Sequence, residues 1–356
     1  MSPRDPRPDH DRGCELHARA QALRDAGRPM QARRLCVRAL ALLRAALGER
    51  HPDIANVLFE LAGTHHDRGE PGPARLHYEA ALRCLGRAGG RDGDRLRLAI
   101  LAPLGELHVA AGRYREALAP WRRAVTVARR LGPAELGGAL NGLGVVHRHL
   151  GRLDAAAALY RQALAEVRRA RPVSRLQLAS LYHNLGGLEH ARERFARGVP
   201  LARRAVAARS AALGPGHLDV AADRAALASL LVGCGRLDEA QTHYRQALAV
   251  LRRRLGPAHF EVGFNLGNLA ALAHLRGHPG PAARLYRRAL AIQEAAAGPD
   301  HPQLAALLTN FAALRRAQGR EPEALALYRR AAHIYARALG ARHPDAVAAR
   351  TALRGA

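Results

Sequence analysis

Residues 227–259, LASLLVGCGRLDEAQTHYRQALAVLRRRLGPAH, carry the pattern that decides the fold. The pattern returns 42 residues later in residues 269–301, LAALAHLRGHPGPAARLYRRALAIQEAAAGPDH. In each copy a glycine follows the first leucine by eight residues, and alanine, tyrosine and alanine follow that glycine by five, nine and twelve residues. Recurrence at a fixed period of this length is typical of a repeat protein, whose core grows in one direction by stacking.

The repeat extends over most of the chain. Its turn glycines are Gly27, Gly69, Gly112, Gly151, Gly235, Gly277 and Gly319. Consecutive glycines lie 39 to 43 residues apart, except for one gap of 84 residues, or two periods, centred on Glu193. Nine residues after the glycine, an aromatic residue recurs at Tyr78, Trp121, Tyr160, Tyr244, Tyr286 and Tyr328.

Each unit is predicted to contain two helices, called A before the glycine and B after it. Offsets of three, four and seven residues place the recurring apolar residues on one stripe of a helix. Small residues such as Gly105 and Gly144 stand beside large ones, which lets two helices approach closely. Because signals for β-strands are nearly absent, we predict an all-α fold.

A recurring linker joins one unit to the next. It reads LGERHPD at residues 47–53, LGPGH at 213–217, LGPAH at 255–259, GPDHP at 298–302 and LGARHPD at 339–345. With the 42-residue period, this linker resembles that of the tetratricopeptide repeat of the kinesin-light-chain type, which also occurs in bacterial regulatory and scaffold proteins. The resemblance covers about residues 14–345. It implies a right-handed α–α superhelix of about eight helix–turn–helix repeats and a bacterial source.

Three regions depart from the regular repeat. Residues 1–13, rich in Pro, Arg and Asp, are predicted to be a disordered tail, and residues 346–356 a short C-terminal capping helix. Residues 174–216 form a degenerate unit in which Glu193 replaces the turn glycine and Pro200 falls inside helix B. We predict a loosened repeat there. Either this unit acts as a hinge, or its sequence has drifted from the repeat pattern without a functional reason.

The composition favours a soluble, cytoplasmic protein. The net charge is +26, and none of the 56 basic residues is lysine. An arginine-only set is typical of a GC-rich genome, although such a surface also attracts polyanions. The 4 cysteines form no CxxC pair, which indicates free thiols in a reducing compartment. We expect neither a secretory signal nor a membrane-spanning segment.

In the family that the chain resembles, A helices line a concave groove where partners lie as extended or helical peptides. The inward positions of the A helices predict a peptide-binding groove formed by Asn141, Arg148, His149, His183, Asn184, His190, Asn268, His274, Asn310 and Arg316. The same face is predicted to include Thr309 and, in earlier repeats, Asn56, Glu60, His66, Asp67 and Glu106.

Asn184, Asn268 and Asn310 share one offset, nine residues before the turn residue. In family members an asparagine at this offset can hydrogen-bond a bound peptide backbone, since an amide both donates and accepts. The alternative is that they are ordinary polar residues on a solvated helix face. Neighbouring His and Arg residues make this part of the groove mildly basic, so an acidic peptide fits the prediction.

No catalytic residue, metal site or cofactor is predicted. Without lysine the chain can form neither a Walker A loop nor a Schiff base, and it contains no HExxH or GxSxG motif. We predict a non-catalytic scaffold or adaptor that binds a peptide segment of another protein. A peptide-sensing regulatory module is an alternative function. The sequence does not reveal the oligomeric state, and we expect no membrane partner.

Nucleic-acid or polyanion binding is the less favoured alternative. It would use arginines expected on the convex side: Arg122, Arg123, Arg161, Arg245, Arg287, Arg288, Arg329 and Arg330. The aromatic residues are predicted to lie in the core, which leaves no platform on which bases could stack.

Overall fold

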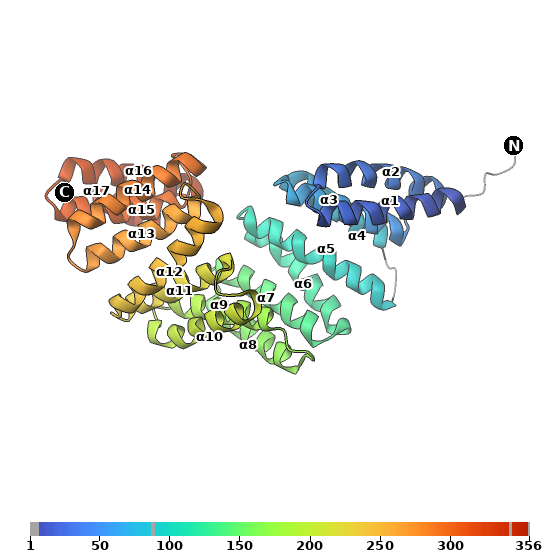
Figure 1. Ribbon diagram of the computed structural model, residues 1–356, viewed down its shortest axis with the longest axis horizontal. Helices are drawn as coiled ribbons and strands as arrows, with labels where there is room; N and C mark the ends of the chain where they lie inside the picture. Colours follow the sequence, from blue (N-terminus) through green and yellow to red (C-terminus); the bar gives the residue numbers. More distant parts are fainter. Residues whose placement is uncertain (1–6, 87–89, 342–343, 355–356) are drawn as a thin grey trace. The chain divides into compact units, whose positions relative to one another are not determined.

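The computed structural model describes residues 7–86, 90–341 and 344–354, and every regular element in them is a helix (Figure 1). The chain divides into two units, Met1–Gln177 and Leu178–Ala356. The first contains α1 (Arg7–Asp25), α2 (Pro29–Leu47), α3 (Pro52–Asp67), α4 (Pro71–Leu85), α5 (Gly90–Ala110), α6 (Tyr114–Leu131), α7 (Pro133–His149) and α8 (Leu153–Arg169). The predicted all-α repeat fold is confirmed.

The boundary between the units falls in the first turn of α9 (Arg175–Ala191). The second unit continues with α10 (Phe195–Leu213), α11 (Leu218–Gly233), α12 (Leu237–Leu255), α13 (Phe260–Leu275), α14 (Pro279–Ala297), α15 (Leu304–Ala317), α16 (Glu321–Leu339) and α17 (Pro344–Arg354). Odd-numbered helices from α1 to α15 are the A helices and even-numbered ones the B helices, so the described residues contain eight helix pairs.

The turn from helix A to helix B has the same backbone conformation in all eight pairs. The seven turn glycines have φ between +70° and +73°. The eighth turn uses Glu193, whose φ is +56°, and the N–H of Arg194 donates to the carbonyl of Glu189 over 2.9 Å. The same bond closes the turn at Gly235, where the N–H of Arg236 donates to the carbonyl of Leu231 over 2.9 Å. Glu193 therefore adopts the left-handed conformation that glycine reaches without strain.

The degenerate unit keeps both of its helices. Pro200 lies inside a continuous α10. Gly186 of α9 and Gly198 of α10 let the two backbones approach, and a Cβ built on Gly198 would lie 3.3 Å from the carbonyl oxygen of Gly186. Nine residues after Glu193, where six other units have an aromatic residue, this unit has Ala202. Close packing of the two backbones takes the place of that aromatic contact.

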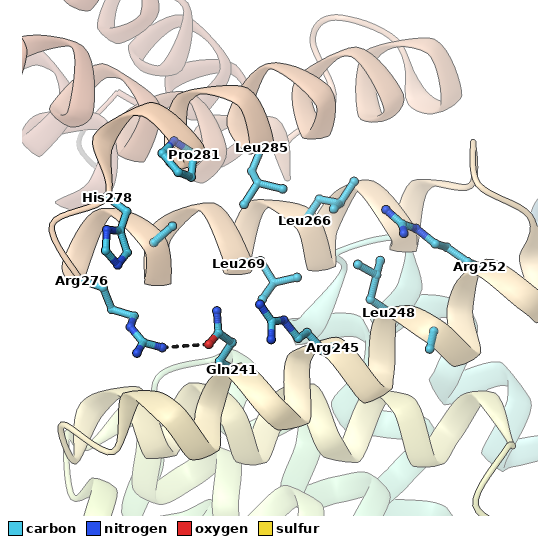
Figure 2. Close-up of a pocket in the computed structure, with 12 residues that line it drawn as sticks. Gln241, Arg245, Leu248, Arg252, Leu266, Leu269, Arg276, His278, Pro281 and Leu285 are labelled. Atoms are coloured by element: carbon cyan, nitrogen blue, oxygen red, sulfur yellow. Dashed lines mark hydrogen bonds between the residues drawn. The ribbon is translucent and has the colours of Figure 1, made fainter.

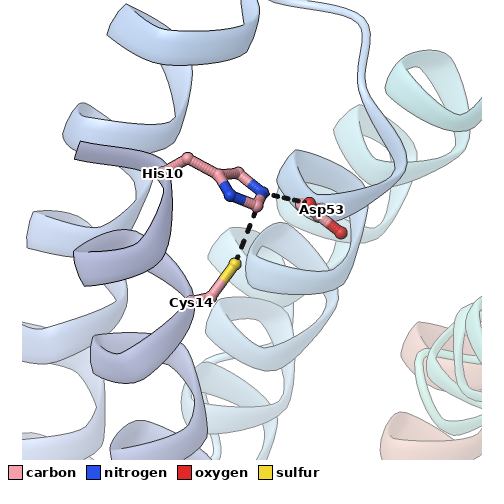
Figure 3. A group of neighbouring side chains, drawn as sticks. All are labelled: His10, Cys14 and Asp53. Carbon is pink, nitrogen blue, oxygen red and sulfur yellow. Dashed lines mark hydrogen bonds and ion pairs between the residues drawn. The ribbon is translucent and has the colours of Figure 1, made fainter. Parts of the chain in front are cut away.

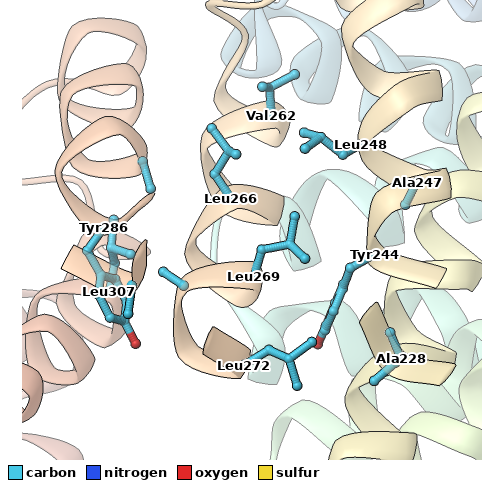
Figure 4. Packing of buried hydrophobic residues seen from close by; sticks show 14 of the residues in the cluster. Ala228, Tyr244, Ala247, Leu248, Val262, Leu266, Leu269, Leu272, Tyr286 and Leu307 are labelled. Carbon is cyan, nitrogen blue, oxygen red and sulfur yellow. The ribbon is translucent and has the colours of Figure 1, made fainter. Parts of the chain in front are cut away.

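The core of each pair is built from large residues against small ones. All six recurring aromatics are buried: Tyr78, Trp121, Tyr160, Tyr244, Tyr286 and Tyr328. Figure 4 shows the Tyr244 side chain of α12 directed between Ala228 of α11 and Leu272 of α13. One B-helix aromatic therefore packs against the A helix of its own pair and that of the next.

The linker histidines cap the helices that follow them. The Nδ1 atoms of His51, His217 and His259 each accept the backbone N–H two residues ahead over 3.2 Å, and His301 does so over 3.4 Å. His51, His217 and His259 each satisfy a backbone donor that the first turn of a helix leaves without a partner, and His301 bonds Gln303, the residue just before α15. These four histidines thus have a structural role in the linker.

Both ends differ from the sequence prediction. Helix α1 begins at Arg7, inside the segment 1–13 predicted to be a tail. Gly13 is buried against Leu43 of α2, and the His10 Nε2 atom lies 3.1 Å from Asp53 Oδ2 of the next repeat. Residues 1–6 lie outside the described part. The closing helix α17 begins at Pro344, two residues before the predicted start, and packs Leu353 against Tyr328. No described helix combines the length and apolar character needed to cross a membrane.

Candidate binding site

The ten residues predicted for one groove are divided between the two units. Asn141, Arg148 and His149 lie on α7 in the first unit, and the other seven lie on α9, α13 and α15. All ten are on A helices, as the repeat pattern predicted. The second unit holds most of them, and its side chains form the site described below.

Several predicted groove residues form hydrogen bonds, ion pairs or ring contacts with other side chains of the protein. The Nδ1 atom of His183 lies 2.7 Å from Oδ1 of Asp223, whose Oδ2 accepts a hydrogen bond from Nε of Arg209 over 2.7 Å. Similar contacts join His190 to Ser229 (2.9 Å), Arg316 to Glu321 (2.8 Å), and the stacked rings of His149 and Tyr114 (centroids 4.5 Å apart). The basic character expected of this face is therefore partly neutralised by carboxylates.

The three asparagines that share one offset have different surroundings. Asn184 and Asn268 are half-buried, and Asn310 is exposed. Asn268 lines a cavity of about 500 Å³ between two neighbouring A helices, α11 and α13, with the end of α12 below them. We call this cavity the A-face pocket, and it is lined by Leu218, Asp219, Ala221, Ala222, Ala225, Ala226, Ser229, Leu251, Leu255, Glu261, Phe264, Asn265 and Asn268.

Asn265 is the most unusual residue of the A-face pocket. Its side chain is 1% exposed, and its Oδ1 atom has no hydrogen-bond partner among the described residues. A buried carbonyl without a donor costs about 1–3 kcal/mol of stability. Sequence reasoning missed Asn265 because it lies one turn before Leu269 on the apolar stripe of α13. A lone polar residue in that stripe was the available signal.

The rest of the A-face pocket is apolar at its floor and acidic at one end. Four alanines of α11 leave space between the helices, and Phe264 remains 43% exposed beside them. Asp219 and Glu261, at the first turns of α11 and α13, are both exposed. Asp219 lies 3.5 Å from Nη1 of Arg209, whereas Glu261 has no ion-pair partner among the described residues. The pocket therefore offers an apolar surface, a hydrogen-bond acceptor and the negative charge of Glu261.

A second cavity, of about 480 Å³, opens on the side of the B helices (Figure 2). We call it the B-face pocket, and it is lined by Gln241, Arg245, Leu248, Ala249 and Arg252 of α12, Leu266, Leu269 and Ala273 of α13, Arg276 just after α13, and His278, Pro281 and Leu285 at α14. Figure 2 shows Leu266, Leu269 and Leu285 at its centre, with Arg245 and Arg252 along α12.

The arginines of the B-face pocket differ in their bonding. Arg276 donates to Gln241 over 2.8 Å and to Asp238 over 2.6 Å, so its charge is compensated. Arg252 is half-buried, and its Nε has no hydrogen-bond acceptor in the described structure. Arg245 is exposed. An apolar floor beside uncompensated guanidinium groups suits a ligand that combines an apolar group with a carboxylate.

The arginines predicted for the convex side are mostly solvated. Seven of the eight are exposed: Arg122, Arg123, Arg161, Arg245, Arg287, Arg288 and Arg329. The eighth, Arg330, donates to Glu294 over 2.6 Å. The aromatic residues near them are buried, so the structure offers no stacked platform for bases beside these charges.

Comparison with protein families gave one consistent result. A model of the tetratricopeptide repeat matches residues 13–86, 96–166, 222–295 and 282–337, and a second model of this repeat matches residues 178–219. These matches span most of the chain and include the degenerate unit around Glu193. A search of curated proteins found no match to the chain.

Solved structures with the same fold include three from different sources. BtubC (BKLC) from P. vanneervenii is 25% identical, with a TM-score of 0.53 over 65% of this chain and 94% of that chain. A tetratricopeptide repeat protein from Parabacteroides merdae is 17% identical, with a TM-score of 0.56 over 84% and 97%. A Rap protein complexed with Competence and Sporulation Factor is 12% identical, with a TM-score of 0.61 over 97% of both chains.

Proposed function

Because the chain belongs to the tetratricopeptide repeat family, we propose that it is a non-catalytic scaffold that binds a segment of another protein in the A-face pocket. The unpartnered Oδ1 of Asn265 carries this proposal. A buried acceptor that lowers the stability of the free protein is explained when a ligand supplies the missing donor.

The pocket chemistry defines the segment that would bind. When the Asn265 side chain turns toward the pocket, a backbone N–H of an extended peptide can donate to its Oδ1, which is buried in the free protein. Asn268, one turn away and half-buried, provides a second amide. An apolar side chain of the peptide fills the space lined by the α11 alanines and covers Phe264, which removes exposed apolar surface from water.

The charge at the rim favours a cationic residue next to the apolar anchor. Glu261 lies at the end of the pocket where α13 begins, next to Asp219, which is paired with Arg209. This differs from the acidic ligand that the sequence suggested, since His183 lies against Asp223 and Arg316 is paired with Glu321. The segment proposed for the A-face pocket is therefore extended, apolar at one position and basic beside it.

The Rap protein is known in complex with Competence and Sporulation Factor, and it shares the fold of this chain over almost its whole length. At 12% identity this likeness supports the scaffold and not the identity of the ligand. A peptide-sensing role for this chain is a second form of the same proposal, and the sensed peptide would bind in the A-face pocket.

Peptides selected from a display library on the purified chain provide the test, with affinities measured by fluorescence anisotropy. We expect Asn265→Leu to weaken binding about tenfold, the effect of one lost hydrogen bond. Its thermal stability should be maintained or raised, because the buried acceptor is gone. Asn310→Ala, outside the pocket, is the matched control. Equal affinities for wild type, Asn265→Leu and Phe264→Ala would reject the A-face pocket.

A second candidate is an acidic peptide segment at the B-face pocket, favoured by the unpartnered Nε of Arg252. Glutamate-containing peptides should then bind more weakly to Arg252→Gln and normally to Asn265→Leu. Nucleic acid as the ligand would instead show affinity that falls steeply with salt and depends on the exposed arginines of many B helices.

A further inference from the structure

The first unit holds a cluster of three metal-ligand side chains that the binding function does not use. His10 and Cys14 lie one turn apart on the same face of α1, and Asp53 lies at the start of α3. Figure 3 shows the His10 ring directed toward Asp53, with Cys14 below it. In the described part of the chain, this is the single group of three His, Cys or acidic residues whose ligand atoms all lie within 4.8 Å of one another.

We propose that His10, Cys14 and Asp53 bind one zinc-class transition-metal ion. The Nε2 atom of His10 lies 3.1 Å from Asp53 Oδ2 and 3.6 Å from Cys14 Sγ. A tetrahedral Zn²⁺ with ordinary bond lengths separates its N and O ligands by about 3.4 Å and its N and S ligands by about 3.6 Å. These two spacings are close to those of ligands on one ion, and Sγ of Cys14 and the Asp53 carboxylate lie within 4.8 Å of each other.

In the metal-free protein the three atoms are joined by hydrogen bonds. With a neutral thiol and an ionised carboxylate, Nε2 of His10 faces a donor in Cys14 and an acceptor in Asp53. A protonated Nε2 donates mainly to the carboxylate, with the Cys14 sulfur as a weak second acceptor, and an unprotonated Nε2 accepts from the thiol and leaves the carboxylate without this donor. A cation between the three atoms satisfies all of them at once.

The surroundings hold two of the ligands in place. The other ring nitrogen of His10, Nδ1, lies 3.3 Å from Oδ1 of Asp11, which is the contact that commonly orients a metal-binding imidazole. The N–H of Asp53 donates to Nδ1 of His51 over 3.2 Å, which fixes the start of α3. These partners present Nε2 of His10 and the Asp53 carboxylate toward Cys14.

The donor set defines the kind of ion. Nitrogen and thiolate ligands favour Zn²⁺, Co²⁺ or Ni²⁺ over Mg²⁺ and Ca²⁺, which prefer oxygen. Thiolate and carboxylate together neutralise the divalent charge, and binding releases the thiol proton of Cys14. Three protein ligands leave one position for water. The ion would fasten α1, the first helix of the stack, to α3 of the next repeat.

Cobalt titration of the reduced, full-length protein tests the site, because only a thiolate ligand gives an intense near-ultraviolet charge-transfer band. We expect this band to saturate at one Co²⁺ per chain, to disappear in Cys14→Ser and to persist in Cys84→Ser, a matched half-buried cysteine. Added Zn²⁺ should bleach it and raise the melting temperature of wild type but not of Asp53→Asn. Absence of the band from wild type, or its persistence in Cys14→Ser, would overturn the proposal. Exposed histidines that bind cobalt produce no such band, so the chain's other histidines cannot imitate a positive result.

Discussion

Trp121 packs directly against Gly142, so that a Cβ built on Gly142 would overlap the indole ring. Gly105 lies against the same ring from α5. The tryptophan of one B helix therefore occupies the space that two glycines leave on the flanking A helices. Such contacts, repeated along each unit, join one helix pair to the next.

Gly142→Ala should lower the free energy of unfolding by about 1–3 kcal/mol, because the added methyl group forces Trp121 out of its position. Gly138→Ala, one turn earlier on α7, is the matched control, since the nearest atom to its Cβ would be Nε2 of Gln177 at 3.5 Å. There alanine should raise stability by about 0.5–1 kcal/mol through its higher helix propensity. Urea unfolding measures both. Equal effects of the two substitutions would contradict the packing described.

Glu193→Gly should stabilise the protein by up to about 1 kcal/mol. The left-handed conformation costs a residue with a side chain about 1–2 kcal/mol, and the greater freedom of glycine in the unfolded chain offsets part of this gain. The reverse change at an equivalent turn, Gly235→Glu, should lower stability. A melting temperature that falls in Glu193→Gly would show that the Glu193 side chain has a role beyond the turn.

The fold was predictable because its determinants recur locally. Turn glycines, core aromatics and linker histidines each repeat at one offset, and a single period of sequence therefore indicates where the helices begin and end. The glycine-rich segment 137–144 also follows from packing: Gly142 accommodates Trp121, and Gly144 accommodates Tyr160. Glu193 was harder to interpret, because nothing in an isolated glutamate shows that its neighbours hold it in a glycine conformation.

The candidate site was predictable only in part. The offset rule identified Asn268, which does line the A-face pocket. It could not show that His183 lies against Asp223, because the two residues are 40 positions apart and meet only when repeats stack. It also could not show that Asn265 lacks a hydrogen-bond partner, since this depends on every neighbouring side chain. Repeat periodicity predicts which face a residue occupies, whereas the pairing of polar atoms depends on tertiary contacts.

Asp223→Ala should lower the free energy of unfolding by about 3 kcal/mol. Asp223 is 2% exposed and accepts the Nε hydrogen bond of Arg209, whose guanidinium would be left without this carboxylate in a largely buried position. Asp238→Ala is the control, because its pair with Arg276 is exposed and should contribute less than about 1 kcal/mol. Chemical denaturation of both variants gives the comparison, and a loss no larger than that of Asp238→Ala would refute the buried pair.

Stability should fall as the solution is made acidic, in part through His77. Burial lowers the pKa of His77, and the nearby His65, Arg33 and Arg44 lower it further. The unfolded chain then binds the proton more tightly, so the contribution of His77 is complete above about pH 6.5 and is lost as the pH falls below it. His77→Gln should show a smaller drop in melting temperature between about pH 7.5 and about pH 5.5. The exposed His66→Gln should retain the wild-type drop, and an unchanged drop in His77→Gln would contradict the burial argument.

The most direct test of the binding function is to locate a bound peptide. A photoreactive amino acid replaces Ala222 in the A-face pocket or, as the matched variant, Ala249 in the B-face pocket; both positions are exposed. A library-selected peptide with an apolar and a basic residue is then crosslinked and identified by mass spectrometry. Crosslinking from position 222 and not from 249 is the predicted result. Crosslinking from 249 alone, or from neither position despite binding, would contradict the proposed site.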